Sequence, residues 1–280
     1  MTVVSFFAKV FEPIQVIIQR MTFHLNTNKP PFWRWLTSEL SERMAQNLPF
    51  IKINPQHILC VGGFEKSTHQ LFKQTYPQST LSSDQEIKLG IEHVLNKLNP
   101  FKKNQMTFFD IDQNVQTERF DLIWSGPLKR NIDTFPHFFS QAGQHLKVHG
   151  LIMFNYLGPD TAKEYRSLVT QKGWLGPDMH DIGDLLTQSG FADPVMNMEY
   201  LTLEYEDTEL LMKDMVELGL LKDQDLLSAS IREFFTDIHQ VNEKLNLTLE
   251  IVYGHAWKVP KREPGVTRIS PAEILKTYKK

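Results

Sequence analysis

Short apolar runs alternate with amphipathic stretches along most of the chain. The apolar runs have the length of strands and lie at 57–63, 79–84, 106–111, 120–126 and 149–158. Three- and four-residue spacing of apolar positions predicts helices before and between them, at 31–48, 65–75, 85–98 and 133–147. Strands that alternate with helices are typical of βαβ units, and they predict an open, mostly parallel sheet with helices on its faces.

The pattern changes after residue 158. Helices are predicted at 160–171, 180–189, 207–218 and 228–245, and alternating positions predict strands at 196–205 and 247–258. Asp178 is the predicted N-cap of the second of these helices, and Gly190 follows its end. We therefore expect a helical insertion at about 158–189 and an antiparallel pairing of the two late strands at one edge of the sheet.

The first 30 residues form an apolar segment with its own periodicity. Apolar residues follow each other at four- and three-residue steps, at Val3, Phe7, Val10, Ile14, Ile17 and Met21. This spacing predicts an N-terminal helical extension over 1–30, which either packs on its own domain or meets a protein partner or a membrane surface through residues 3–21. No run reaches the ~18 apolar residues that a membrane span needs. The main domain is then 31–260, followed by a basic tail over 261–280.

Charge and cysteine content narrow the function classes. The 30 basic and 33 acidic residues give a net charge of −3, which argues against a broad electrostatic surface for nucleic acid. The single cysteine, Cys60, excludes an internal disulfide and a cysteine-rich zinc site, and it indicates a reducing compartment, so we expect a cytoplasmic protein. His180 and Asp181 have no further ligands near them in sequence, and no metal site is predicted.

The ends of the predicted strands carry the chemistry. The first strand ends at Gly62 and Gly63, the second ends in Asp84, and the third carries Asp110 near its end. Ligands of open α/β sheets bind beyond the carboxyl ends of the strands, where small residues let backbone N–H groups approach them. An acid after the second strand commonly accepts hydrogen bonds from ribose hydroxyls. This layout is that of an S-adenosylmethionine site in a class I methyltransferase, a Rossmann-like αβα sandwich.

Several phrases add a more specific resemblance. GPDT, DMHDIGDLL, GFADPVM and YGHAW occur within 156–169, 177–205 and 250–258. Together they resemble the malonyl-acyl-carrier-protein O-methyltransferases of biotin synthesis, and they are similar to the related mitochondrial complex I assembly hydroxylases. The resemblance covers roughly 32–258. It implies S-adenosylmethionine as cofactor, an acyl carrier protein as partner, and methylation of the free carboxyl group of malonyl-acyl carrier protein. It also adds Ser125, on the fourth strand, to the cofactor-binding residues.

The sequence departs from the family around the first strand. The family motif resembles D-x-G-x-G-x-G, and its acid and three glycines fall on Cys60, Gly62, Phe64 and Lys66. The chain has 14 glycines in 280 residues, 5% against a usual share of about 7%, and part of the shortfall lies here. The family's S-N-L-x-L-Q-W motif after the fourth strand keeps only its Ser and one Leu, and the N-terminal tyrosine motif is absent.

These departures leave other functions open. One is a catalytically inactive relative with a degenerate cofactor loop that acts through protein partners. Another is methylation of a different small molecule or protein, or a hydroxylation like that of the assembly factors.

Three residues are candidates for the substrate side. Arg166 lies in the family-like stretch after GPDT, and its guanidinium either holds a substrate carboxylate or forms a surface salt bridge. Tyr156 opens the same stretch. His255 shares one strand face with Tyr253 and Trp257, which predicts either a pocket wall or packing at the sheet edge.

Overall fold

Eight strands of the described chain form one sheet. The structure, a computed structural model, describes residues 15–20, 32–62, 66–84, 107–112, 118–128, 134–173, 176–241 and 244–260. The strands are β1 (Gln15–Arg20), β2 (His57–Val61), β3 (Thr80–Ser83), β4 (Thr107–Phe108), β5 (Phe120–Leu128), β6 (Leu146–Leu157), β7 (Phe191–Tyr205) and β8 (Leu245–Lys258), in the order β1-β7-β8-β6-β5-β2-β3-β4. Every neighbouring pair is parallel except the two that involve β8, so β8 alone runs against the other described strands.

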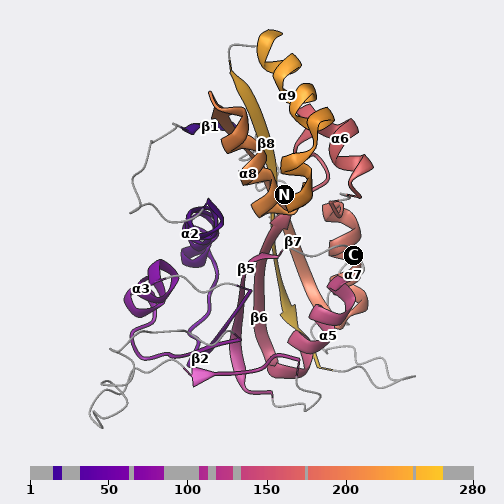
Figure 1. Cartoon of the computed structure of the whole chain (residues 1–280). Helices are drawn as coiled ribbons and strands as arrows, with labels where there is room; N and C mark the ends of the chain where they lie inside the picture. The colour runs from indigo at the N-terminus through magenta and orange to yellow at the C-terminus, as the bar shows by residue number, and fades with distance from the viewer. Residues whose placement is uncertain are drawn as a thin grey trace, which may run out of the picture.

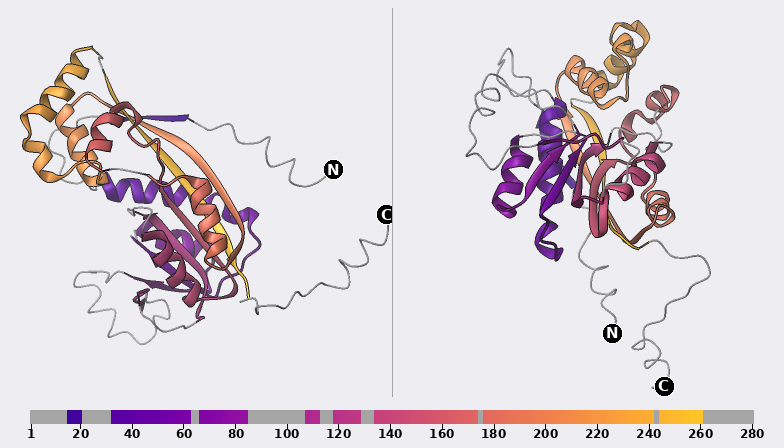
Figure 2. Two further views of the ribbon diagram at one scale, coloured as in Figure 1. Left: turned by 90° about the vertical axis from the view of Figure 1, so that its right-hand side faces the viewer. Right: turned by 90° about the horizontal axis from the view of Figure 1, so that it is seen from below.

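Helices cover both faces of the sheet and one of its ends. On one face lie α2 (Phe32–Ala45) and α3 (Lys66–Thr75), and on the other lie α5 (Phe135–His145) and α7 (Met179–Gln188) (Figure 1). The remaining helical elements, apart from the short η1 (Leu48–Phe50), gather around the far part of β7 and β8 (Figure 2). They are η3 (Lys163–Tyr165), α6 (Arg166–Gln171), α8 (Thr208–Leu218), η4 (Asp223–Leu227) and α9 (Ala229–Val241).

The core divides into two layers because side chains of successive strand residues point to opposite faces. Ile58 and Cys60 of β2 pack with Trp124 beneath α2 and α3, whereas Leu59 and Val61 pack with the phenylalanines of α5. The αβα sandwich predicted from the sequence is therefore confirmed, with one apolar cluster between the sheet and each helical layer. In the described part of the chain, no helix has the length and apolar character needed to cross a membrane.

The late strands pair as predicted, although not at the outer edge. β7 and β8 are antiparallel over most of their lengths, and β8 is also antiparallel to β6. Asp178 caps α7 by accepting a hydrogen bond from the His180 N–H (2.7 Å), and Gly190 follows with φ +89°, as the helix-end pattern predicts.

The N-terminal segment needs a correction. Residues Gln15–Arg20 form a strand rather than part of the predicted helix, and β1 lies parallel to β7 at the outer edge of the sheet. Val16 stands opposite Leu201 and Ile18 opposite Leu203, so a two-residue alternation underlies this part of the segment. The other residues of 1–31, the predicted helix at 85–98 and the tail at 261–280 lie outside the described residues.

A second correction concerns the predicted helix at 160–171. Its first residues form a loop, Ala162 has φ +56°, and helical structure begins only with η3 and continues in α6. The reason is tertiary, because the Ala162 N–H donates to the Thr248 carbonyl oxygen of β8 (2.7 Å) rather than to a neighbouring residue of its own segment.

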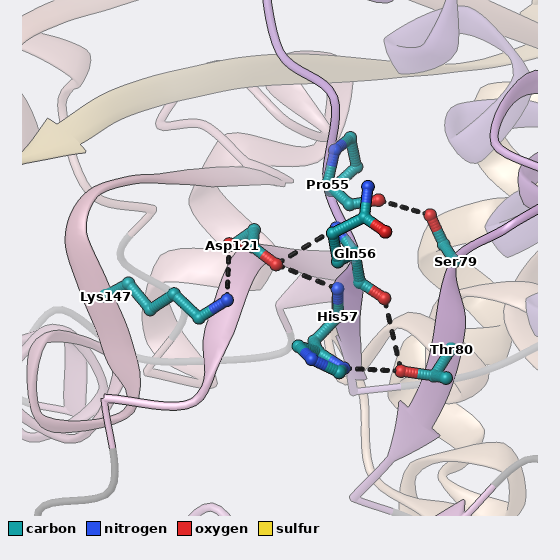
Figure 3. A network of polar contacts seen from close by, with 7 residues as sticks. All are labelled: Pro55, Gln56, His57, Ser79, Thr80, Asp121 and Lys147. Carbon is teal, nitrogen blue, oxygen red and sulfur yellow. Dashed lines mark hydrogen bonds and ion pairs between the residues drawn. The ribbon is translucent and has the colours of Figure 1, made fainter.

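A polar network fixes the register of the strands at their amino ends (Figure 3). Asp121 of β5 accepts the backbone N–H groups of Gln56 (3.0 Å) and His57 (2.9 Å) and pairs with Lys147 (2.7 Å). Partial burial alone would raise the pKa of Asp121, but these donors hold it below its usual range. Thr80 of β3 completes the network through His57 Nδ1 (2.6 Å). This network lies at the opposite end of the strands from the predicted cofactor site.

Candidate functional site

The carboxyl ends of four parallel strands meet at one edge of the sheet, as the sequence predicts. Cys60 of β2 pairs with Ser83 of β3, Ser83 pairs with Phe108 of β4, and Val61 pairs with Ser125 of β5. Gly62 and Asp84 directly follow Val61 and Ser83, Asp110 lies two residues beyond Phe108, and Ser125 is the partner of Val61 itself. Register thus places the predicted cofactor-binding residues Gly62, Asp84, Asp110 and Ser125 within about two residues of one line across the sheet.

Gly62 and Asp84 form the best-defined contact of this line. The Gly62 N–H lies 3.2 Å from Oδ1 and 3.1 Å from Oδ2 of Asp84, so one donor is shared between both carboxylate oxygens. Gly62 has φ +81°, a left-handed conformation that glycine adopts without steric cost. The turn after β2 therefore depends on a glycine at this position and on the acid at the end of β3.

Asp110 and Ser125 lie on either side of this contact. Asp110 is exposed, and its Oδ1 accepts the Asp112 N–H (3.0 Å), which leaves the rest of its carboxylate facing solvent. Ser125 is buried, and its hydroxyl points to the carbonyl oxygens of Gly126 (3.3 Å) and Val61 (3.5 Å). Gly63 lies outside the described residues.

Cys60 is the residue next to this turn that faces the α2 side. It is fully buried, and burial raises the pKa of its thiol, with the charge of Asp84 raising it further. The thiol is therefore neutral and apolar in character.

Comparison with known proteins agrees with this geometry. No family model matches the chain. The malonyl-[acyl-carrier protein] O-methyltransferase of Gallionella capsiferriformans is 32% identical over 266 residues, covering 87% of this chain and 90% of the relative. That of Nitrosospira multiformis is 31% identical over 266 residues, covering 83% and 85%.

The chain belongs to the malonyl-[acyl-carrier protein] O-methyltransferase family. Solved structures agree on the fold. The YcgJ protein of Bacillus subtilis aligns with a TM-score of 0.53 at 9% identity, covering 79% of this chain and all of the other. A candidate methyltransferase of Bacillus halodurans aligns with a TM-score of 0.51 at 14% identity, covering 78% and 100%.

The family-like GPDT phrase forms a loop that is bound to β8 through Glu250. The Gly158 N–H donates to the Glu250 carbonyl oxygen (2.8 Å), and the Asp160 N–H donates to Glu250 Oε2 (2.5 Å). The Thr161 hydroxyl accepts the Glu250 N–H (3.2 Å). A Cβ at Gly158 would lie 2.5 Å from the Glu250 carboxyl carbon, so any larger residue there would require the Glu250 side chain to shift. The phrase is thus explained by how the loop packs, without any ligand.

Arg166 is found in an exposed ion pair. Its Nη2 lies 2.5 Å from Asp160 Oδ1, and the Tyr200 hydroxyl donates to Asp160 Oδ2 (3.0 Å). The hydrogen bond from Arg166 is the main cause that holds the pKa of Asp160 below its usual range. The structure contains the surface salt bridge that the sequence offered as one of two readings of Arg166. A role in holding a substrate carboxylate stays a prediction.

Tyr156 and His255 lie on opposite faces of the sheet. Tyr156 is fully buried with Phe135 and Phe154 on the α5 side, its hydroxyl has no hydrogen-bond partner among the described residues, and burial raises its pKa. His255 shares the α2-side face with Tyr253, as predicted, and burial lowers its pKa. The structure therefore does not bring these two candidates together in one pocket.

Two acidic strand residues, one buried and one partly buried, were missed at the level of sequence. Glu250 is 7% exposed, and burial raises the pKa of its carboxyl group. Glu199 of β7 pairs with Arg43 of α2 (2.9 Å) and accepts the Tyr253 hydroxyl (2.7 Å). The signal was present, because each glutamate interrupts an otherwise apolar or uncharged strand pattern, and such a residue needs a partner when it is buried.

Proposed function

We propose that the protein transfers a methyl group from S-adenosylmethionine to the free carboxyl group of malonyl-acyl carrier protein. The observation that carries the proposal is the Gly62–Asp84 turn at the carboxyl ends of β2 and β3, in a chain that belongs to this family over 87% of its length. An acyl carrier protein is then the substrate partner, and we infer that the reaction takes place in the cytoplasm.

The described residues fit the cofactor. Gly62 has no side chain to keep a ligand from the backbone, and an ionised carboxylate such as that of Asp84 can accept more than one donor. Asp84 would accept hydrogen bonds from the ribose hydroxyls, Asp110 offers a second carboxylate nearby, and buried Ser125 forms the floor beside Val61. When bound, S-adenosylmethionine supplies an already activated methyl group.

The protein's own contribution is positioning rather than acid–base chemistry. A carboxylate acceptor is already nucleophilic at neutral pH, so the chain has to hold it close to the methyl group and keep water away. Among the described candidates, Arg166 is the one cation predicted to hold the substrate carboxylate, and it would have to leave Asp160 to do so.

The decisive experiment has two parts. Calorimetry with S-adenosylmethionine and S-adenosylhomocysteine measures whether the folded protein binds either ligand. Incubation with methyl-labelled S-adenosylmethionine and malonyl-acyl carrier protein then measures transfer, with acetyl-acyl carrier protein as the matched substrate that lacks a free carboxyl group. We expect micromolar binding and label in the malonyl product alone. Absence of binding below millimolar concentration would overturn the proposal and favour the catalytically inactive relative.

Substituting Arg166 tests the substrate side separately. Arg166→Gln should raise KM for malonyl-acyl carrier protein about tenfold while leaving S-adenosylhomocysteine affinity unchanged, because a charged hydrogen bond contributes about 1.5–3 kcal/mol. Unchanged KM would mean that Arg166 serves only its pairing with Asp160.

A further inference from the structure

The carboxylate of Asp84 is bound to the chain itself at the point where a ligand would approach. Both of its oxygens face the Gly62 N–H, at 3.2 and 3.1 Å. An ionised carboxylate has about four acceptor sites, so it can accept more than one donor. The contact is charge-assisted and is therefore stronger than a bond between two neutral groups.

A backbone contact reinforces the side-chain contact. The Asp84 N–H donates to the Cys60 carbonyl oxygen (3.1 Å), and the preceding Ser83 pairs with Cys60 in the sheet. Asp84 thus binds the chain immediately before and immediately after Val61, with its backbone on one side and its carboxylate on the other. The left-handed φ of +81° at Gly62 lies directly after the second of these anchors.

The neighbouring Cys60 cannot share this task. Its side chain is a buried, neutral thiol that faces the core between the sheet and α2, and it offers only a weak acceptor. Among the side-chain contacts of Gly62 in the described residues, the bond to the Asp84 carboxylate is the one that fixes its N–H.

We propose that Asp84 is a positioning residue for the turn after β2, in addition to the ribose contact inferred for it above. This second role is to keep the Gly62 backbone in place before a ligand arrives. It rests on the proposed function only because that function supplies the ligand. It predicts that the turn is ordered by Asp84 in the ligand-free protein. A residue that served the ribose alone would not affect the turn when no ligand is bound.

The experiment follows the Gly62 amide in the full-length, ligand-free protein. Val61–Gly62 is the one Val–Gly step in the sequence, so labelling valine carbonyls with ¹³C and glycine amides with ¹⁵N selects the Gly62 amide among 14 glycines. Hydrogen exchange of this amide is measured in the unmodified protein, in Asp84→Asn and in Asp110→Asn. Asp110 is the matched control, because it is an acid at the end of the next strand whose described contact is to Asp112.

We expect a protected Gly62 amide in the unmodified protein and at least about tenfold faster exchange in Asp84→Asn, since the charge assistance of the bond is lost. Asp110→Asn should leave this exchange unchanged. Fast exchange in the unmodified protein, or equal exchange in both variants, would overturn the inference. Asp84→Glu keeps the charge on a longer side chain, and we expect an exchange rate between those of the unmodified protein and Asp84→Asn. If Asp84→Asn does not fold, Asp84→Glu replaces it in this test.

Adenosine binding separates this inference from the proposed function. If the unmodified protein binds neither adenosine nor S-adenosylmethionine, the proposed function fails, while the exchange rates still decide the role of Asp84 in the turn. If Asp84→Asn weakens adenosine binding but leaves Gly62 exchange unchanged, the ribose contact stands and the positioning role is wrong.

Discussion

Single residues in this protein act through partners that are distant in sequence. Glu250 is bonded to the loop at Gly158–Thr161, and Asp84 is bonded to Gly62. In each case a strand residue holds a loop that follows another strand. The loop that contains GPDT is therefore held by a β-strand side chain as well as by its own turn hydrogen bonds.

Replacing Gly158 by alanine tests this packing. The added Cβ would lie 2.5 Å from the Glu250 carboxyl carbon, which is buried and held by the Asp160 N–H. We expect Gly158→Ala to lower the free energy of unfolding by about 1–3 kcal/mol, the usual cost of overpacking. Urea denaturation gives the value.

Gly183→Ala is the matched control for this substitution. Gly183 lies within α7, and a Cβ there would meet Met196 Cγ at an ordinary 3.6 Å. Because alanine is the better helix former, this variant should gain about 0.5–1 kcal/mol. Equal changes in the two variants would contradict the role given to Gly158.

For single residues, the sequence identified candidate side chains but did not identify the groups that those side chains contact. The acid after the second strand and the glycine after the first were identifiable as Asp84 and Gly62, because strand ends share one edge of a parallel sheet. Their mutual hydrogen bond was not, since it depends on the backbone angle of Gly62. The surroundings of Tyr156 and His255 could not be predicted from the sequence either, because strand alternation predicts which residues share a face of the sheet but not which helices cover that face.

Individual elements follow the sequence where local and tertiary preferences agree. The helix capped by Asp178 and the strands from β2 to β8 form close to their predicted positions. The predicted helix at 160–171 fails at its start, where Ala162 has a left-handed φ of +56° while the N–H groups of Ala162 and Asp160 donate to Thr248 and Glu250 of β8.

The same loop predicts an unusual pH dependence of stability. Burial raises the pKa of Glu250 in the folded protein above its value in the unfolded chain. The unfolded state then loses its proton first as the pH rises, so the free energy of unfolding falls between the unfolded and folded pKa values of this carboxyl group and stays lower above them. Glu250→Gln removes the effect and keeps an acceptor for the Asp160 N–H.

We expect the free energy of unfolding of Glu250→Gln, relative to the unmodified protein, to increase as the pH rises from 4 through this window. Urea midpoints at a series of pH values between 4 and 7 measure the difference. Asp160 provides a comparison of opposite sign, because Arg166 lowers its pKa and its stabilising effect is lost as the pH falls. A difference that does not change with pH would contradict the raised pKa of Glu250.

At the scale of the whole molecule, the sheet continues past the strands that carry the candidate site. β7 and β8 are the two longest described strands, and their far parts lie among α8, α9 and α6 (Figure 1). β1 closes the outer edge of β7 there. A helix was predicted for this segment because its apolar residues fit a helical spacing as well as the two-residue spacing of a strand. The open edge of β7 is what favours the strand. A sequence read on its own contains no information about that edge.

Two truncations test what β1 contributes to the whole molecule. Deletion of residues 2–20 removes β1 and leaves the edge of β7 at Tyr200–Tyr205 without its partner, whereas deletion of residues 2–12 keeps β1. Each net hydrogen bond contributes about 0.5–1.5 kcal/mol, so the longer deletion should cost on the order of 2–4 kcal/mol of unfolding free energy and the shorter one little. Urea denaturation measures both.

Hydrogen exchange shows where the effect of the longer deletion lies. Amides within 200–205 should exchange faster only when β1 is removed, because an edge strand without a partner leaves its outward N–H groups to solvent. The freed edge should also promote association of the truncated chains, which sedimentation at increasing protein concentration detects. If both truncations have the same stability and the same exchange at 200–205, β1 does not stabilise the sheet, and residues 15–20 are then free to meet a partner.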